Sequence, residues 1–122
     1  MAEDIIRFKR KIYNTMLNWK KERNGDTALL IQGARRVGKS TIAEEFARNE
    51  YKSYILIDFS KISKEVNELF NDISDLNYLF IRLQFIFQVK LHERESVIIF
   101  DEVQLQPKAR QAIKHLVKDH RY

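Results

Sequence analysis

The sequence predicts a three-layer α/β fold, in which helices cover both faces of a mostly parallel sheet. Two short runs, residues 55–57 and 97–100, are wholly apolar, as parallel strands covered on both faces usually are. A third apolar run, residues 28–31, leads through a glycine-bounded loop into a segment with helical periodicity. Strands that alternate with helices in this way give a parallel sheet.

Length and composition indicate one soluble domain. A chain of 122 residues has room for one core, and 44% hydrophobic with 32% charged residues is typical of a globular protein. No apolar run is long enough for a membrane helix, and the first eleven residues lack the apolar region of a secretory signal. The absence of cysteine excludes disulfides and thiol catalysis. We therefore expect a cytoplasmic protein without a membrane partner.

The first predicted element is an amphipathic helix over residues 4–23. Its apolar residues recur at steps of three and four, as expected for one buried helix face. These residues are Ile5, Phe8, Ile12, Met16 and Trp19. Gly25 follows at a position suited to the left-handed cap that ends a helix. We expect Phe8 and Trp19 to pack in the core rather than to stack on a ligand.

Residues 33–40, which read Gly-Ala-Arg-Arg-Val-Gly-Lys-Ser, match the phosphate-binding P-loop pattern G-x-x-x-x-G-K-[ST]. Gly33 leaves the strand through a turn that a Cβ would hinder, and Gly38 lets the backbone close around a phosphate. Backbone N–H groups of the loop and of the following helix would point at the anion. An ordinary strand–turn–helix with a coincidental lysine is the alternative.

Side chains at the end of this loop extend the predicted site. Lys39 would bring an ammonium to the β- and γ-phosphates, and Ser40 would offer a hydroxyl to Mg²⁺. The predicted nucleotide-binding residues are Gly33, Ala34, Arg35, Arg36, Val37, Gly38, Lys39, Ser40 and Thr41. The expected ligands are therefore ATP and Mg²⁺, although the preference for adenine does not follow from these residues.

Residues 53–59 are predicted to form the next strand, and Asp58 lies at its carboxyl end, where open α/β sheets place ligands. Asp58 would either support the Mg²⁺ site or cap the next helix. Ser60 is a second candidate for that cap. Residues 61–91 are predicted to be mostly helical. Residues 76–91 are apolar around most of the helix, so we expect them to fill a core layer or to meet another protein surface.

Residues 96–104 give the second half of a nucleotide site, the Walker B pattern. Four apolar residues precede Asp101 and Glu102, so Asp101 would hold Mg²⁺ opposite Ser40 at the tip of a buried strand. Glu102 would act as general base on a water, and we count it as catalytic together with Lys39. A strand that merely ends in acids is the alternative. Gln104 would face either the terminal phosphate or solvent.

The last predicted helix begins at Pro107, a residue suited to the first helical turn, and runs to about residue 119. Its basic residues lie largely outside the apolar face. The three histidines are scattered without metal-ligand spacing, so we expect them at the surface. The net charge of +5 permits binding to nucleic acid but does not argue for it.

These motifs together resemble the N-terminal part of the prokaryotic AAA-type ATPases whose P-loop reads Gly-Ala-Arg-x-Val-Gly-Lys. The resemblance is carried by GARRVGKST, YILIDF, VIIFDEVQ, PKARQAIKHLV and the leading helix with Arg10, Lys11, Ile12, Tyr13 and Trp19. It implies a partial AAA-type domain over residues 1–122, with the N-terminal helix at 1–24 and a P-loop NTPase core at 27–122. It also implies ATP binding and hydrolysis, with Lys39, Ser40, Asp101 and Glu102 in the roles given above.

The chain departs from this family in length. In the family a further strand carrying a polar sensor residue follows the final helix and lies between the Walker A and Walker B strands. Its absence would leave residues 28–31 and 97–100 without a shared neighbour, which is costly for buried backbone groups. We therefore expect a fragment or truncated product that pairs these two strands directly or self-associates to complete the sheet. Helix 76–91 would suit such an interface.

The function that the sequence predicts is that of an ATP-binding domain, with hydrolysis slow or absent in this chain alone. A nucleotide-gated module that binds nucleic acid or protein without useful turnover is the alternative. Arg35, Arg36 and the basic side of the last helix favour it. A P-loop small-molecule kinase would need an arginine-rich lid, which the sequence does not show.

Overall fold

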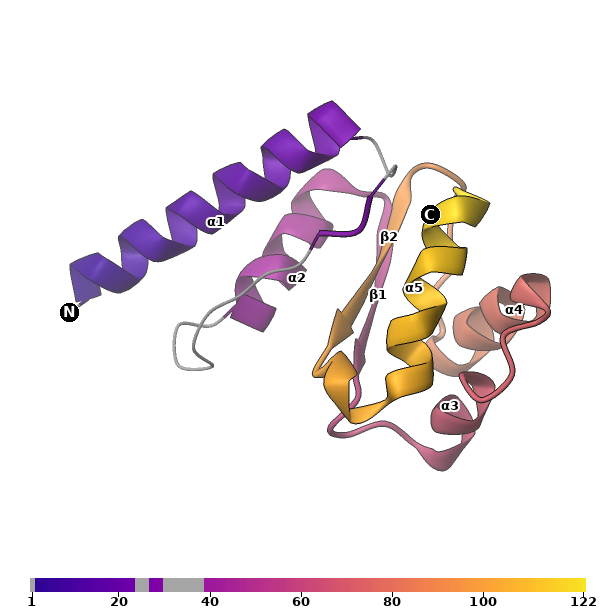
Figure 1. Ribbon diagram of the computed structural model, residues 1–122. Coiled ribbons are helices and arrows are strands. Elements are labelled where there is room, and N and C mark those ends of the chain that lie inside the picture. The colour runs from indigo at the N-terminus through magenta and orange to yellow at the C-terminus, as the bar shows by residue number, and fades with distance from the viewer. Residues whose placement is uncertain (1, 24–26, 30–38) are drawn as a thin grey trace.

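The computed structural model describes residues 2–23, 27–29 and 39–122. The chain order alternates helices with two strands (Figure 1). The elements are α1 (Ala2–Arg23), α2 (Lys39–Glu50), β1 (Ser53–Asp58), α3 (Lys64–Leu69), α4 (Leu76–Phe87), β2 (Ser96–Asp101), the 3₁₀-helix η2 (Val103–Leu105) and α5 (Pro107–Asp119). Within these described residues, no helix is both long and apolar enough to cross a membrane.

The two strands pair in parallel, with Ser53 opposite Ser96 and Asp58 opposite Asp101. This confirms the α/β fold and the strands predicted around 53–59 and 96–101. Of the third apolar run, residues 28 and 29 are described and belong to no strand, whereas residues 30 and 31 lie outside the described residues. The described sheet is therefore two-stranded.

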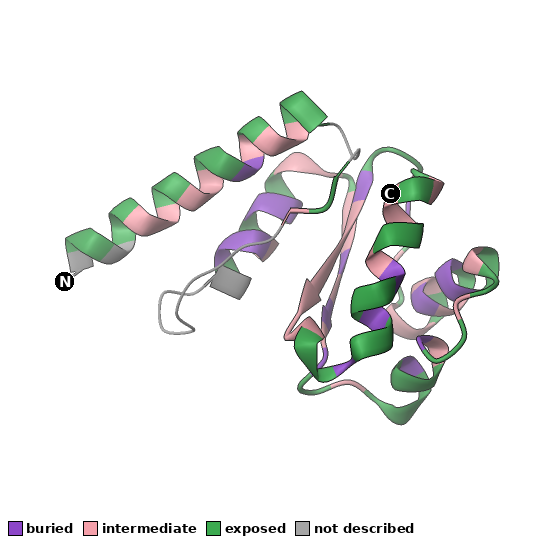
Figure 2. Ribbon diagram, viewed as in Figure 1, coloured by how far each residue is buried: buried purple, intermediate pink, exposed green. Residues whose placement is uncertain are grey.

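Helices lie on both sides of the strands, as the sequence predicts for three layers. In Figure 1, α1 and α2 lie on one side of the sheet, and α3, α4 and α5 lie on the other. Ile99 packs with Met16 and Phe46 in the cluster of α1 and α2, while Ile98 and Phe100 pack against the larger cluster on the opposite face. Successive side chains of β2 thus enter different layers, which explains its wholly apolar sequence. Figure 2 shows exposed residues along the outer sides of α1 and α5.

Residues 61–91 are mostly helical, as the sequence predicts, and the helical residues are divided between α3 and α4. The interruption lies between α3 and α4 and contains short polar side chains that compete for backbone hydrogen bonds. Asp72 Oδ1 accepts a hydrogen bond from the Ser74 N–H (3.0 Å), and Asp75 Oδ1 accepts one from the Tyr78 N–H (3.1 Å), which begins α4. These local hydrogen bonds stabilise a turn between α3 and α4, although the apolar residues on either side recur with a helical period.

α4 is buried on one face only in the chain as described, so it does not fill a core layer by itself, and the alternative that it meets another protein surface stays a prediction. Leu79, Phe80 and Leu83 are buried. On its opposite side Tyr78, Ile81 and Phe85 are 55%, 63% and 64% exposed. This row of large apolar side chains is the feature of the fold that favours self-association.

We predict that the chain self-associates through this row on α4. Ile81→Glu places a charge in the contact, so it is expected to lower the average mass toward that of one chain. Asn71→Glu, which adds the same charge at an exposed site outside α4, is the matched control and should leave the mass unchanged. Sedimentation over a concentration series measures both, and a single-chain mass for the wild type at every concentration would disprove the prediction.

Candidate functional site

The carboxyl ends of β1 and β2 bring two acidic residues to one edge of the sheet. Asp58 and Asp101 are register partners, and the Phe59 N–H donates to the Asp101 carbonyl at 2.9 Å. Both side chains are half-buried. Carboxylate oxygens are the ligands that Mg²⁺ prefers, so this pair fits the ion that the sequence predicts. The parallel pairing, and not sequence proximity, places the two carboxylates together.

Asp58 does not cap the following helix. Its Oδ1 accepts hydrogen bonds from the Ser60 N–H (2.9 Å) and the Ser60 hydroxyl (2.6 Å), which forms a local turn after β1. The cap of α3 is Ser63, whose hydroxyl accepts from the Val66 N–H at 3.2 Å. The prediction that Asp58 or Ser60 caps this helix is therefore wrong, and the support of Mg²⁺ by Asp58 stays a prediction.

Glu102 follows β2 in an unusual backbone conformation. Its φ of 56° and ψ of 39° are left-handed, which costs a residue other than glycine about 1–2 kcal/mol. Its Oε2 accepts a hydrogen bond from Gln104 Nε2 at 2.5 Å, and Gln104 is exposed. Backbone strain of this kind is concentrated at functional sites. Gln104 thus turns back toward Glu102 from an exposed 3₁₀ turn.

The corner between β2 and α5 is fixed by Gln106, which the sequence analysis missed. The side chain of Gln106 is buried, its Nε2 donates to Asn67 Oδ1 at 2.6 Å, and its Oε1 accepts from the Lys108 N–H at 3.3 Å. It therefore joins the start of α5 to α3. The sequence does contain a signal for this role, which is the polar Gln106 directly before Pro107. Proline favours the first helical position, so the residue before it is the one that can cap the helix.

The other half of the predicted site lies at the start of α2. Gly33, Ala34, Arg35, Arg36, Val37 and Gly38 lie outside the described residues. Lys39 and Ser40 are the first two residues of α2, their side chains are not described, and Thr41 in the same turn is exposed. In Figure 1 the start of α2 lies at the same end of the sheet as the carboxyl ends of both strands. The backbone therefore places Lys39 and Ser40 at the end of the sheet that carries Asp101.

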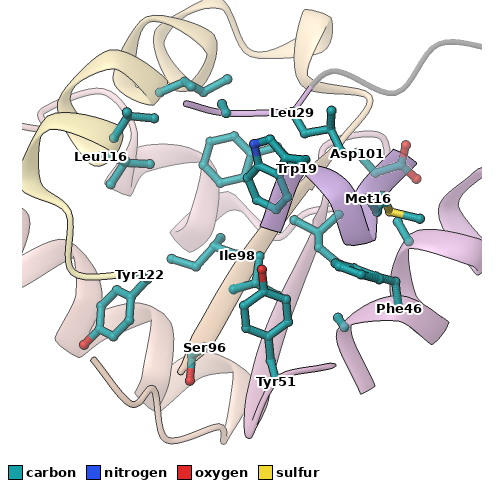
Figure 3. Close-up of a pocket in the computed structure, with 18 of the residues that line it drawn as sticks. Met16, Trp19, Leu29, Phe46, Tyr51, Ser96, Ile98, Asp101, Leu116 and Tyr122 are labelled. Carbon is teal, nitrogen blue, oxygen red and sulfur yellow. The ribbon is translucent and has the colours of Figure 1, made fainter. Parts of the chain in front are cut away.

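A cavity of about 390 Å³ extends along β2 from Ser96 to the acidic end of the strand (Figure 3). Asp101, Glu102 and Gln104 line one end of it. Its walls are mostly apolar, and burial raises the pKa of Tyr51, which also lines it, to about 12. Among the described residues, including those at this acidic end, no group of three or more histidine, cysteine, aspartate or glutamate side chains is placed to hold a metal ion.

Comparison with known proteins identifies the family. A family model described as an AAA domain matches residues 25–122, which is well over half of the chain. Neither a curated protein nor a solved structure matches the chain. The matched region contains both strands and every predicted site residue. The chain therefore belongs to the AAA domain family and has the nucleotide-binding, ATPase-like fold of that family.

Proposed function

We propose that this chain binds Mg·ATP at the carboxyl edge of its sheet. The observation that carries the proposal is the position of Asp101 at the end of β2. The neighbouring parallel strand, β1, ends in Asp58, and Ile99 of β2 packs against α2. That packing fixes the helix that begins at Lys39 relative to the acidic tip. A phosphate-binding sequence followed by such a helix, opposite an acidic strand end, suits a nucleoside triphosphate with its metal ion.

Each residue of the proposed site has one role. The Lys39 ammonium balances phosphate charge, and the N–H groups of residues 33–38 and the start of α2 bind phosphate oxygens. Ser40 and Asp101 hold Mg²⁺, and Asp58 supports them from the adjacent strand. When bound, the ion neutralises charge that develops on the phosphates.

Glu102 is proposed to be the general base for hydrolysis. It directly follows the proposed metal ligand Asp101, and its left-handed backbone directs its side chain differently from the strand residues before it. The hydrogen bond from Gln104 restricts where the carboxylate lies. A carboxylate in this position would take the proton of an attacking water.

Glu102→Gln tests this role. Loss of the base is expected to lower turnover about 100-fold and to leave Mg·ATP affinity unchanged, since glutamine keeps the shape of the side chain but cannot accept the proton. Single-turnover release of radiolabelled phosphate and a binding titration measure the two quantities. Glu93→Gln, an exposed site with the same change, is the control.

Three outcomes are informative. Equal phosphate release by the wild type and Glu102→Gln would contradict the role of Glu102 as base. ATP binding that is lost in this variant would instead show that Glu102 is a ligand. Binding without turnover in the wild type would favour the alternative of a nucleotide-gated binding module, for which the exposed basic side of α5 is the supporting feature. The residues on that side are Lys108, Arg110, Lys114 and Lys118.

A further inference from the structure

α1 contacts the chain on both sides of the phosphate-binding loop sequence, residues 33–38. Met16 of α1 packs in one apolar cluster with Leu29, which precedes that sequence, and with Phe46 of α2, the helix that begins after it at Lys39 (Figure 3). Apolar packing has no preferred direction, so it holds these segments together without fixing their register. Hydrogen bonds, which are directional, are needed to fix it.

The first of these hydrogen bonds comes from Trp19, near the carboxyl end of α1. Its indole N–H donates to the Thr27 carbonyl at 3.0 Å and lies 3.3 Å from the Thr27 hydroxyl oxygen. The indole has one donor and no acceptor, so this contact sets the orientation of the ring as well as the position of the chain at Thr27. Trp19 thus holds the segment that leads into the phosphate-binding sequence.

Two further side chains of α1 bond to the carboxyl end of α2. Lys20 Nζ donates to the Glu50 carbonyl at 2.8 Å and lies 4.7 Å from the Tyr51 ring centre. The Tyr13 hydroxyl donates to Glu50 Oε2 at 3.4 Å and accepts from the Asn49 side-chain amide at 3.0 Å. Carbonyls in the last turn of a helix have no partner within it, and a cation is favourable there. These bonds fix α2 along its axis relative to α1.

We call α1 with its three bonding side chains the α1 clamp. These side chains are Tyr13, Trp19 and Lys20. The clamp holds Thr27 on one side of the phosphate-binding sequence and Glu50 on the other. Because α2 is a continuous helix of 12 residues, fixing Glu50 at its end also fixes Lys39 at its start. A ligand bound between two segments costs less conformational entropy when their relative position is already set.

We propose that the α1 clamp is a positioning element for the nucleotide site. Trp19 and Lys20 hold the chain before and after the phosphate-binding sequence in the arrangement that binds Mg·ATP. The inference rests on the proposed function and adds to it a role for α1, which contributes none of the motif residues. Both side chains act through the backbone positions of Thr27 and Glu50, without contact to the ligand. The expected consequence of releasing either one is therefore weaker binding.

Two conservative substitutions each release one side of the α1 clamp. Trp19→Phe keeps an aromatic ring but lacks the N–H, and Lys20→Met keeps the aliphatic stem but lacks the ammonium group. Each is expected to weaken Mg·ATP binding about fivefold in a calorimetric titration, because one hydrogen bond that positions the site is lost. Lys21→Met, which removes the same charge from an exposed site of α1, is the matched control and should bind as the wild type does.

A purely structural role of these side chains predicts a different pattern. Ser63→Ala removes the cap of α3 on the other side of the sheet, so it should lower resistance to urea while leaving Mg·ATP affinity unchanged. Either clamp substitution already frees one of the two sides. The double variant of Trp19→Phe and Lys20→Met should therefore bind about tenfold more weakly than the wild type at most, whereas independent effects would multiply to about 25-fold.

The wild-type chain provides a test without any substitution. Trp19 is the only tryptophan of the chain, so its indole N–H gives a single NMR signal. Energetic coupling is reciprocal: if the bond from Trp19 to Thr27 strengthens Mg·ATP binding about fivefold, bound Mg·ATP strengthens that bond by the same factor. Saturation with Mg·ATP should therefore slow hydrogen exchange of the indole N–H about fivefold.

The outcomes separate the role of the α1 clamp from the proposed function. No binding of Mg·ATP to the wild type would overturn both. Binding to the wild type with equal affinity in Trp19→Phe and Lys20→Met, or indole exchange that Mg·ATP leaves unchanged, would overturn the role of the clamp alone. So would an equal loss of affinity in Ser63→Ala, since affinity would then follow stability, or a 25-fold loss in the double variant.

Discussion

Phe70→Ala is expected to lower the free energy of unfolding by about 3–5 kcal/mol, the range typical of a buried aromatic side chain. Phe70 is 0% exposed. Its ring contacts Phe59 at 5.4 Å and Phe100 at 5.5 Å between centroids, and the latter two are 5.3 Å apart, all in edge-to-face geometry. The substitution therefore removes one member of a packed set of three rings and leaves a cavity between α3 and the ends of both strands.

Urea unfolding followed by circular dichroism measures this effect. The matched control is Leu105→Ala, because Leu105 lies outside α4 and is 57% exposed, so its truncation should change the free energy of unfolding by less than about 0.5 kcal/mol. Equal effects of the two substitutions would contradict the packing described here. The result also bears on the site, since Phe100 immediately precedes Asp101 and Phe59 immediately follows Asp58. Loss of the Phe70 ring should loosen both acidic strand ends.

The strands and the last helix were predictable from the sequence because each has a strong local signal. Residues 55–57 and 97–100 are continuously apolar, and the structure explains this by packing against helices on both faces. Pro107 marked the start of α5 correctly because its missing N–H costs nothing at the first helical turn. The same apolar signal located Asp101 at the end of β2 and Glu102 directly after it, whereas their roles in the site stay predictions.

Features that depend on competition between local bonds were not predictable. The apolar periodicity of residues 61–91 gave no sign that Asp72 and Asp75 would form side-chain bonds that separate α3 from α4. Periodicity also cannot show that the chain leaves Ile81 and Phe85 uncovered. The left-handed backbone of Glu102 is set by the turn into η2 and has no signal in residue type, since glutamate is not a residue that favours it.

The most direct test of the proposed function is calorimetric titration of Mg·ATP into the wild-type chain and into Lys39→Ala. We expect saturable binding to the wild type and a loss of affinity of about 10- to 100-fold in the variant, because charge-assisted hydrogen bonds to phosphate are removed. Lys52→Ala, at an exposed lysine that pairs with Glu95, is the control and should bind as the wild type does. Equal affinity of the wild type and Lys39→Ala, or no binding to either, would contradict a nucleotide site at the start of α2.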